Sequence, residues 1–209
     1  MSPAPPRPLQ PFDQRIRIWG LRGLALLAAP LVLFTRPAWA ADGWAVETME
    51  TLGIYLVVAA VVGRFWAILY IGGRKNREVV RDGPYSVCRH PLYLFSTLGV
   101  VGFGLMLGSL TLALALGGAV GLALWATAGR EEAWLRQDLG PAYAAYAAEV
   151  PRLWPRPSLF RTPPRITVAM GALRTNFADA LVFLALLPLA ELLEGAKASG
   201  WLPLGLSLP

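Results

Sequence analysis

The sequence is poor in the side chains that most often bind metals or form covalent intermediates, with one histidine and one cysteine in 209 residues. A single cysteine excludes an internal disulfide framework. Zinc-type sites take several nitrogen and sulfur ligands, so we expect no metal site either. Both residues, Cys88 and His90, fall in one stretch, GPYSVCRHPLYLF, at the edge of a long apolar run.

Charged residues are also scarce, at 15% of the chain against about 25% in soluble domains. Hydrophobic residues make up 56% and the mean hydropathy is +0.50, which together favour a polytopic membrane protein in contact with a lipid bilayer. The net charge of +6 lies in the gaps between apolar segments. Because no basic helix with interleaved aromatics is present, we expect no nucleic-acid partner.

Apolar segments alternate with polar ones along most of the chain. A helix of about 20 residues crosses a hydrocarbon core of about 30 Å. The segments expected to form membrane helices are Ile16 to Phe34, about Thr51 to Ile71, 91–107, 110–128 and about Phe177 to Leu193. We therefore predict an all-α polytopic membrane bundle of about five transmembrane helices.

The N-terminal region allows two interpretations. Residues 1–14 hold five prolines and are expected to form a disordered tail, which leaves residues 15–209 as a single membrane domain. The arginines, the apolar core and Ala38-Trp39-Ala40 that follow also resemble a signal peptide with its cleavage site. The length of the apolar stretch favours a retained first transmembrane helix.

The long uncharged run from Pro91 to Ala128 is expected to fold back on itself. Gly108-Ser109 near its middle is typical of a tight turn between two antiparallel helices. Each helix carries a G-x-x-x-G motif, and small residues at that spacing let helices approach closely in lipid. The two pairs are Gly104 with Gly108 and Gly117 with Gly121.

The predicted hairpin brings two polar segments together. His90 lies 18 residues before Gly108 and Glu131 lies 22 residues after Ser109, which is about 27 and 33 Å along a helix. The residues expected to meet at one membrane face are Arg89, His90, Arg130, Glu131 and Glu132. The paired N–H donors of arginine and the free N–H groups at a helix start suit the carboxylate of a ligand. The glutamates suit an ammonium or sugar hydroxyls, and nearby aromatic rings suit a base. The competing interpretation is that these charged residues form surface ion pairs and set the orientation of the protein in the membrane.

A polar, amphipathic segment follows the hairpin. Gly140-Pro141 is expected to separate two short helices. One face of this segment carries apolar residues at steps of three or four, namely Leu135, Leu139, Tyr143, Tyr146 and Val150. Inside the second apolar segment, Arg64 is expected either to snorkel or form a structural ion pair, or to contact an anionic ligand.

The basic residues are unevenly distributed between the loops. Four lie up to Arg22, five between Arg74 and Arg89, and seven between Arg130 and Arg174, while the first loop has one and the hairpin turn has none. This pattern predicts a cytoplasmic N-terminus and an external C-terminus. We expect an integral protein of a bacterial inner membrane.

The two polar segments carry a recognisable pattern. GPYSVCRHPLYL, an apolar hairpin and then REEAWLRQDLGPAYAAYAAEVPRLWP together resemble the isoprenylcysteine carboxyl methyltransferase and phospholipid methyltransferase superfamily of membrane enzymes. The resemblance covers roughly residues 63–155 as a motif core. Cys88 replaces a common aliphatic residue, and Asp138-Leu139 replaces the aromatic that usually precedes the glycine.

This resemblance implies methyl transfer from S-adenosylmethionine to a lipophilic small molecule or a lipidated acceptor at the cytoplasmic face, through a carboxylate, thiol or amine. It implies the catalytic residues Arg130, Glu131 and Glu132. The cofactor-binding residues that it implies are Tyr85, Arg89, His90, Pro91, Tyr93, Glu132, Tyr143 and Tyr146.

Two other functions are compatible with the same residues. One is a sterol-type membrane reductase that uses NADPH, because those enzymes share an R-H-P-x-Y-like site. The other is a non-catalytic accessory protein of the same fold. Within the methyltransferase interpretation, His90 is expected to hydrogen-bond the cofactor or to act as a base. Cys88 is expected to pack or to act as a nucleophile.

Overall fold

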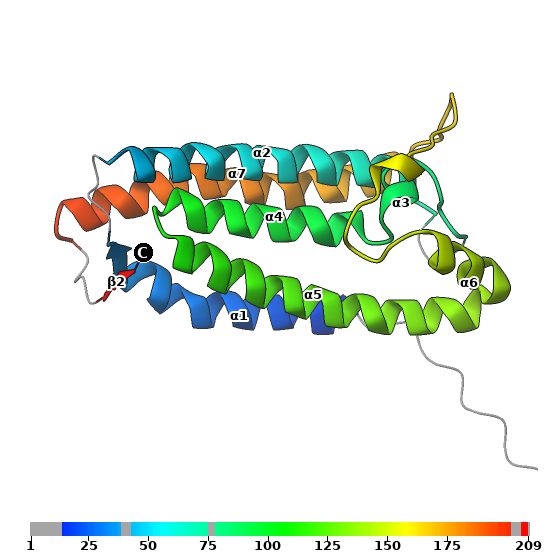
Figure 1. Cartoon of the computed structure of the whole chain (residues 1–209), viewed down its shortest axis with the longest axis horizontal. Helices are drawn as coiled ribbons and strands as arrows, with labels where there is room; N and C mark the ends of the chain where they lie inside the picture. Colours follow the sequence, from blue (N-terminus) through cyan, green and yellow to red (C-terminus); the bar gives the residue numbers. More distant parts are fainter. Residues whose placement is uncertain (1–13, 39–42, 75–77, 202–205, 209) are drawn as a thin grey trace, which may run out of the picture.

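The protein is an elongated helical bundle (Figure 1). The computed structural model describes residues 14–38, 43–74, 78–201 and 206–208. The helices in this part of the chain are α1 (Gln14–Phe34), α2 (Trp44–Ile71), α3 (Pro84–Val87), α4 (Pro91–Met106), α5 (Leu110–Asp138), α6 (Gly140–Glu149), the 3₁₀ helix η1 (Pro157–Leu159) and α7 (Met170–Ala198). Apart from Gln14, which begins α1, the predicted disordered tail lies outside the described residues.

The predicted all-α membrane bundle is confirmed. Among the described residues, α2, α5 and α7 are long and apolar enough to cross a membrane, with mean hydropathies of 2.1, 1.8 and 1.8. α4 and the apolar part of α1, Ile18–Phe34, are shorter apolar helices. Of the five predicted spans, three therefore meet the length requirement and two are apolar helices in the same bundle.

Most of the helices are longer than the apolar segments that predicted them, although α4 ends one residue earlier, at Met106. α2 begins at Trp44 rather than Thr51, and α5 continues to Asp138, ten residues beyond position 128. Hydropathy marks where a helix leaves an apolar environment, whereas backbone hydrogen bonding continues until a breaker intervenes. For α5 that breaker is Gly140, with φ of 55°.

The predicted hairpin between α4 and α5 is confirmed. Gly108 turns the chain with φ of 63°, and the Ser109 hydroxyl caps α5 by accepting the Leu112 N–H at 3.2 Å. A Cβ at Gly104 would collide with the backbone of Ala113, which shows that this glycine permits close helix packing.

Two features hold the helices together at the end of the bundle opposite to His90. An apolar core cluster there joins residues of α1, α2, α4, α5 and α7, including Val57, Leu107 and Leu112. Two three-residue strands, β1 (Thr35–Pro37) and β2 (Leu206–Leu208), pair in parallel, so that the segment after α1 meets the C-terminal segment. These strands were not predicted, because three residues are too few to display the period of a strand.

The His90 end of the bundle is closed by α6 and by the Pro-rich connector before α7 (Figure 1). Tyr143, Tyr146 and Val150 are buried together with Leu135 and Leu139 packed against them, so the predicted apolar face is confirmed. The connector crosses the segment between α2 and α4 and binds it through backbone hydrogen bonds. These include Gly83 to Arg161 at 2.8 Å and Arg156 to Val87 at 2.9 Å.

Candidate active site

His90 is fixed by the start of α4. It precedes Pro91, which occupies the first turn of the helix, where a missing N–H is tolerated. The backbone N–H groups of Arg89 and His90 donate to the carbonyls of Pro151 and Arg152 at 2.9 and 3.2 Å. The connector therefore holds the R-H pair in place through backbone hydrogen bonds alone.

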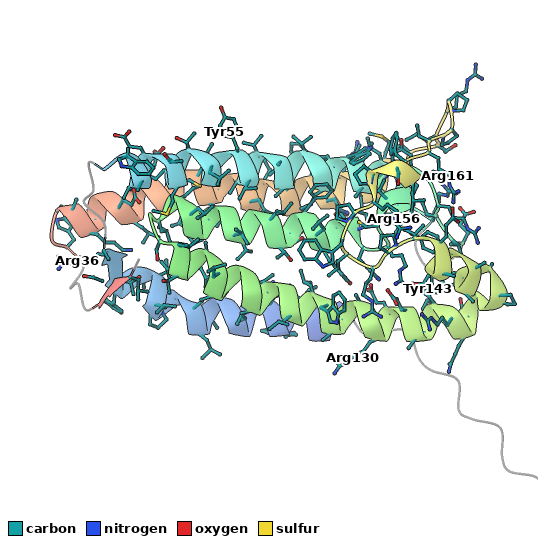
Figure 2. All side chains as sticks on the ribbon, in the orientation of Figure 1. Arg36, Tyr55, Arg130, Tyr143, Arg156 and Arg161 are labelled. Carbon is teal, nitrogen blue, oxygen red and sulfur yellow. The ribbon has the colours of Figure 1, made fainter. Side chains whose placement is uncertain are left out.

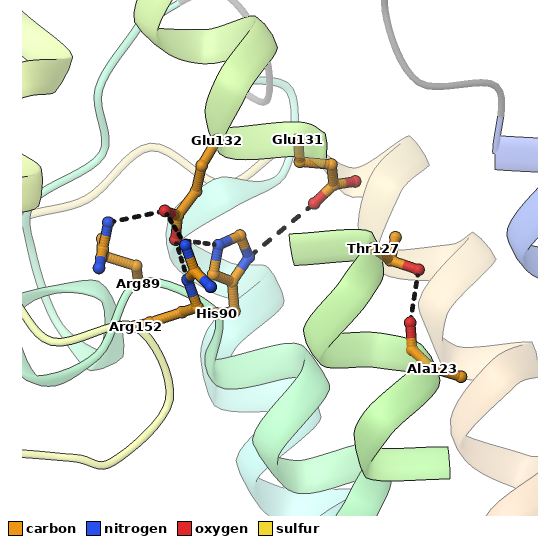
Figure 3. A network of polar contacts seen from close by, with 7 residues as sticks. All are labelled: Arg89, His90, Ala123, Thr127, Glu131, Glu132 and Arg152. Atoms are coloured by element: carbon orange, nitrogen blue, oxygen red, sulfur yellow. Dashed lines mark hydrogen bonds and ion pairs between the residues drawn. The ribbon is translucent and has the colours of Figure 1, made fainter. Parts of the chain in front are cut away.

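Glu132 is the centre of a buried polar cluster, which Figure 3 shows from close by. Its carboxylate accepts from Arg89 at 2.9 Å and lies 3.1 Å from Nε2 of His90. Arg152 donates to both of its oxygens, at 3.0 and 2.9 Å. The side chain of Glu132 is only 2% exposed. We call Arg89, His90, Glu132 and Arg152 the Glu132 cluster. Two arginines compensate the buried carboxylate, which makes it a positioning group rather than a free acid.

Arg152 was not predicted as a site residue. It belongs to the V-P-R part of the second motif, in a segment without helical periodicity. Its guanidinium also lies over the ring of Trp125, 4.8 Å from the centroid, a favourable cation–π geometry. The arginine after the V-P pair in the motif was the available signal.

Glu131 differs from its neighbour in what it faces. It lines the large cavity between the helices, and its carboxylate oxygen is 3.9 Å from Nδ1 of His90 (Figure 3). Glu132 is not among the residues that line this cavity. The two acids therefore contact opposite nitrogens of one imidazole, one from the cavity side and one from the protein side.

The four predicted tyrosines line the same cavity as His90. Tyr93 stacks on its ring, with centroids 5.2 Å apart and an interplanar angle of 4°. Tyr85, Tyr143 and Tyr146 are buried and line the cavity. The Tyr146 hydroxyl donates to the Tyr85 carbonyl at 2.8 Å. Burial raises the pKa of Tyr143 to about 12, so this phenol is a neutral hydrogen-bonding group at neutral pH.

Arg130 does not join the other predicted site residues. Its side chain is exposed and points away from the bundle (Figure 2), and it is absent from the cavity lining. Arg130 therefore lies on a different side of α5 from Glu131 and Glu132, because each successive residue is rotated by about 100° around the helix axis. Its catalytic role stays a prediction. Pro91 is buried at the start of α4 and shapes the helix without lining the cavity.

Cys88 is a packed residue in this structure. Its side chain is 1% exposed, and burial raises the pKa of the thiol to about 12. A thiol with that pKa is protonated at neutral pH and is a poor nucleophile. Of the two interpretations of Cys88, the structure supports packing.

The cavity connects the polar cluster to an apolar interior. Its volume is about 1030 Å³, at the upper end of the range of about 300–1,000 Å³ for small-molecule sites. α1, α2, α4, α5, α6 and α7 all contribute to its wall. Polar residues line it near His90, and leucine, valine and phenylalanine line most of the remainder. This shape and polarity suit a polar ligand at one end and a lipophilic one beside it.

Similarity to known proteins agrees with the site. The phospholipid methyltransferase family matches residues 44–142, from the first residue of α2 into α6. The protein therefore belongs to this family of membrane methyltransferases, within the superfamily that the two motifs indicated. It is an integral membrane protein.

Two relatives match along nearly the whole chain. A nickel-cobalt-cadmium resistance protein, NccN, from Alcaligenes xylosoxydans xylosoxydans is 38% identical over 206 residues, covering 99% of this chain and 96% of the relative. A cobalt-zinc-cadmium resistance protein, CzcN, from Cupriavidus metallidurans is 38% identical over 196 residues, covering 91% of this chain and 89% of the relative. No solved structure matches the chain significantly.

Proposed function

We propose that the protein transfers a methyl group from S-adenosylmethionine to a lipophilic acceptor held in the cavity. The observation that carries this proposal is the position of His90, Glu131 and Arg89 in the wall of a cavity that is otherwise largely apolar. Family membership supports the reaction class. Because both relatives are named as metal resistance proteins, we also propose that the methylated product contributes to metal resistance.

The polar end of the cavity fits the cofactor chemically. Two buried atoms there, Oη of Tyr85 and Nε of Arg89, have no hydrogen-bond partner among the described residues. An arginine and a phenol suit a carboxylate, and the Glu131 carboxylate suits an ammonium or ribose hydroxyls. When bound, S-adenosylmethionine supplies an electrophilic methyl group on a sulfonium centre.

The residues of this chain act mainly by positioning. Methyl transfer is an in-line displacement, and correct orientation alone can lower a barrier by about 7–11 kcal/mol. Arg89 and Glu131 would hold the polar parts of the cofactor, while apolar residues of α1 and α7 would hold the acceptor. A carboxylate acceptor needs no base. For an amine or thiol, His90 and Glu131 are the groups placed to accept the proton.

Ligand stabilisation of the purified protein tests the proposal. S-Adenosylhomocysteine at about 100 times its Kd should stabilise the fold by about 2.7 kcal/mol. For a chain of this size that raises the melting temperature by about 5–10 °C. NADPH should give no shift, which separates the methyltransferase from a reductase.

Variants locate the binding site in the same assay. His90→Ala and Glu131→Gln should lose most of the stabilisation. Glu149→Gln is the matched control, because Glu149 pairs with Arg161 on the surface and does not line the cavity. If S-adenosylhomocysteine did not raise the melting temperature of the wild-type protein, the proposal would be wrong. If the protein is stabilised, incubation of membrane lipids with methyl-labelled cofactor should yield a labelled lipophilic product, whereas an accessory protein would yield none.

A further inference from the structure

A second polar site lies deeper in the same cavity, on Arg64 of α2. The Arg64 guanidinium donates to the Ser96 hydroxyl of α4 at 2.6 Å and lies 3.8 Å from the Asp179 carboxylate of α7. It also sits over the ring of Phe183, 5.3 Å from the centroid. Arg64, Ser96 and Asp179 all line the cavity, together with Asn176.

Helix register gives the depth of this second site. Ser96 follows His90 by six residues on one continuous helix, which corresponds to about 9 Å along its axis. α7 is in step with α2, since a Cβ at Gly72 would lie 3.1 Å from Ala172, seven residues before Asp179. Arg64 is therefore about one and a half turns deeper than the Glu132 cluster.

The Arg64–Asp179 pair is built differently from the Glu132 cluster. Charge-assisted hydrogen bonds are about 2.7–2.9 Å long, as in the Glu132 cluster, whereas Arg64 and Asp179 are 3.8 Å apart. The side chain of Asp179 is 62% exposed, against 2% for Glu132. A charge inside a membrane helix is costly and commonly marks a ligand pathway. Both residues line the cavity, although the side chain of Arg64 is only 13% exposed, so a ligand would meet the guanidinium from the cavity side.

Beyond Arg64, away from His90, the wall is apolar. It includes Val100, Phe103, Leu116, Leu186, Leu189 and Leu193. A hydrocarbon chain in this part of the cavity would have its polar end near Arg64. A guanidinium offers paired donors that match a phosphate or carboxylate.

We propose that Arg64 is a specificity residue that binds an anionic oxygen group, phosphate or carboxylate, on an amphiphile whose chain occupies the apolar part of the cavity. This inference rests on the proposed function, because it assigns the amphiphile as the methyl acceptor. It places the anionic group about 9 Å deeper than His90 along the axis of α4, so the methylated atom is a different part of the same molecule. Asp179 holds the guanidinium in place and competes with the anion for it.

Binding of simple amphiphiles to the full-length protein in maltoside micelles tests the proposal. The probes are dodecyl phosphate, dodecanoate, dodecanol and inorganic phosphate. One or both anionic amphiphiles should bind wild-type protein about tenfold or more tightly than dodecanol, the size expected for a hydrogen bond to a charged group. The stronger of the two identifies the anion as phosphate or carboxylate. Inorganic phosphate should bind weakly, because it lacks the chain.

Four variants separate recognition from damage. Arg64→Gln should reduce the preference for the anionic probe to about twofold or less, and Arg64→Lys should retain part of it because the charge remains. Asp179→Asn should bind the anionic probe more tightly than wild type, which no loss of folding can produce. Arg174→Gln, which removes an exposed arginine of the same helix that is not part of the cavity wall, should change nothing.

Two results would overturn the assignment of Arg64. One is equal binding of dodecanol and the anionic amphiphiles to wild type, and the other is an Asp179→Asn variant with weaker anion binding than wild type. If inorganic phosphate bound as tightly as dodecyl phosphate, the hydrocarbon chain would contribute nothing, and the ligand would not be an amphiphile. Stabilisation by S-adenosylhomocysteine, measured on the same preparations, is independent of these outcomes and tests only the proposed function.

Discussion

The adjacent acids Glu131 and Glu132 have different environments, although the sequence places them as a pair. Glu132 is enclosed by Arg89, His90 and Arg152 and is nearly inaccessible. Glu131 lies in the cavity wall. We infer that Glu132 positions the arginines and the imidazole and that Glu131 meets the ligand. The resemblance implied that both acids are catalytic and that Glu132 also binds the cofactor, whereas this division gives ligand contact to Glu131.

Loss of the Glu132 charge should destabilise the protein itself. Glu132→Gln would leave two part-buried arginines facing an amide, and breaking a buried ion pair costs about 3–5 kcal/mol. Glu131→Gln should leave the free energy of unfolding within about 1 kcal/mol of wild type, because Glu131 lies in the cavity wall and is more exposed than Glu132. Thermal unfolding in detergent without ligand measures both.

The surface variant Glu149→Gln is the control for this comparison, since an exposed pair contributes about 0–1 kcal/mol. If Glu132→Gln unfolded at the same temperature as Glu149→Gln, the Glu132 cluster would have no structural role. The deep burial of Glu132 would then need another explanation.

At the scale of elements, the hairpin of α4 and α5 positions the site. Its close packing brings the start of α4 and the polar part of α5 to one end of the bundle (Figure 1). The predicted packing role of the G-x-x-x-G residues is supported at Gly104 and Gly117, where an added Cβ would strike Ala113 and Val101. The same motifs therefore influence the site from a distance.

A side chain on the packed face of the hairpin should weaken the fold. Gly104→Leu is expected to lower stability by at least about 1–3 kcal/mol, the usual cost of overpacking, because it meets backbone atoms of α5. Gly118→Leu is the matched control, since nothing lies within 4 Å of a Cβ at that position. Melting temperatures of the two variants make the comparison. A Gly104→Leu protein as stable as Gly118→Leu would mean that the helices do not approach closely.

At the scale of the whole molecule, the two ends of the bundle differ in how many basic residues they carry. Arg156 and Arg161 lie at the His90 end and Arg36 at the opposite end (Figure 2). Counted along the chain, five basic residues lie between Arg74 and Arg89 and seven between Arg130 and Arg174, against one in the first loop. The positive-inside rule therefore predicts that the His90 end faces the cytoplasm.

Labelling of single cysteines with a membrane-impermeant maleimide tests this orientation. In a Cys88→Ala background, Arg36→Cys should react in intact bacterial cells, and Arg156→Cys should react only after the inner membrane is permeabilised. Both side chains are exposed, so access to the reagent decides the result. The reverse pattern would place the Glu132 cluster on the external face and contradict the proposed cytoplasmic reaction.

The sequence by itself determined the membrane class, the hairpin and the end of the bundle at which the site lies. Hydropathy indicates which segments lie in lipid. An uncharged run that is too long to cross the bilayer once, with a glycine turn near its middle, is expected to form two antiparallel helices. The common depth of the R-H pair and the two acids follows from helix rise alone, which is the same in every α-helix. The two motifs supplied the family, which similarity to known proteins then confirmed.

Only the tertiary structure decided which side chains face one another. Helix rise fixes depth, but rotation about the axis separates the cavity-facing Glu131 from the enclosed Glu132 and from the exposed Arg130. Arg152 reaches the Glu132 cluster because backbone hydrogen bonds fix an aperiodic connector against residues 83–90, a long-range contact that no local pattern encodes. Arg64 meets Asp179 for a similar reason, since the packing of α2 against α7 joins positions 115 residues apart.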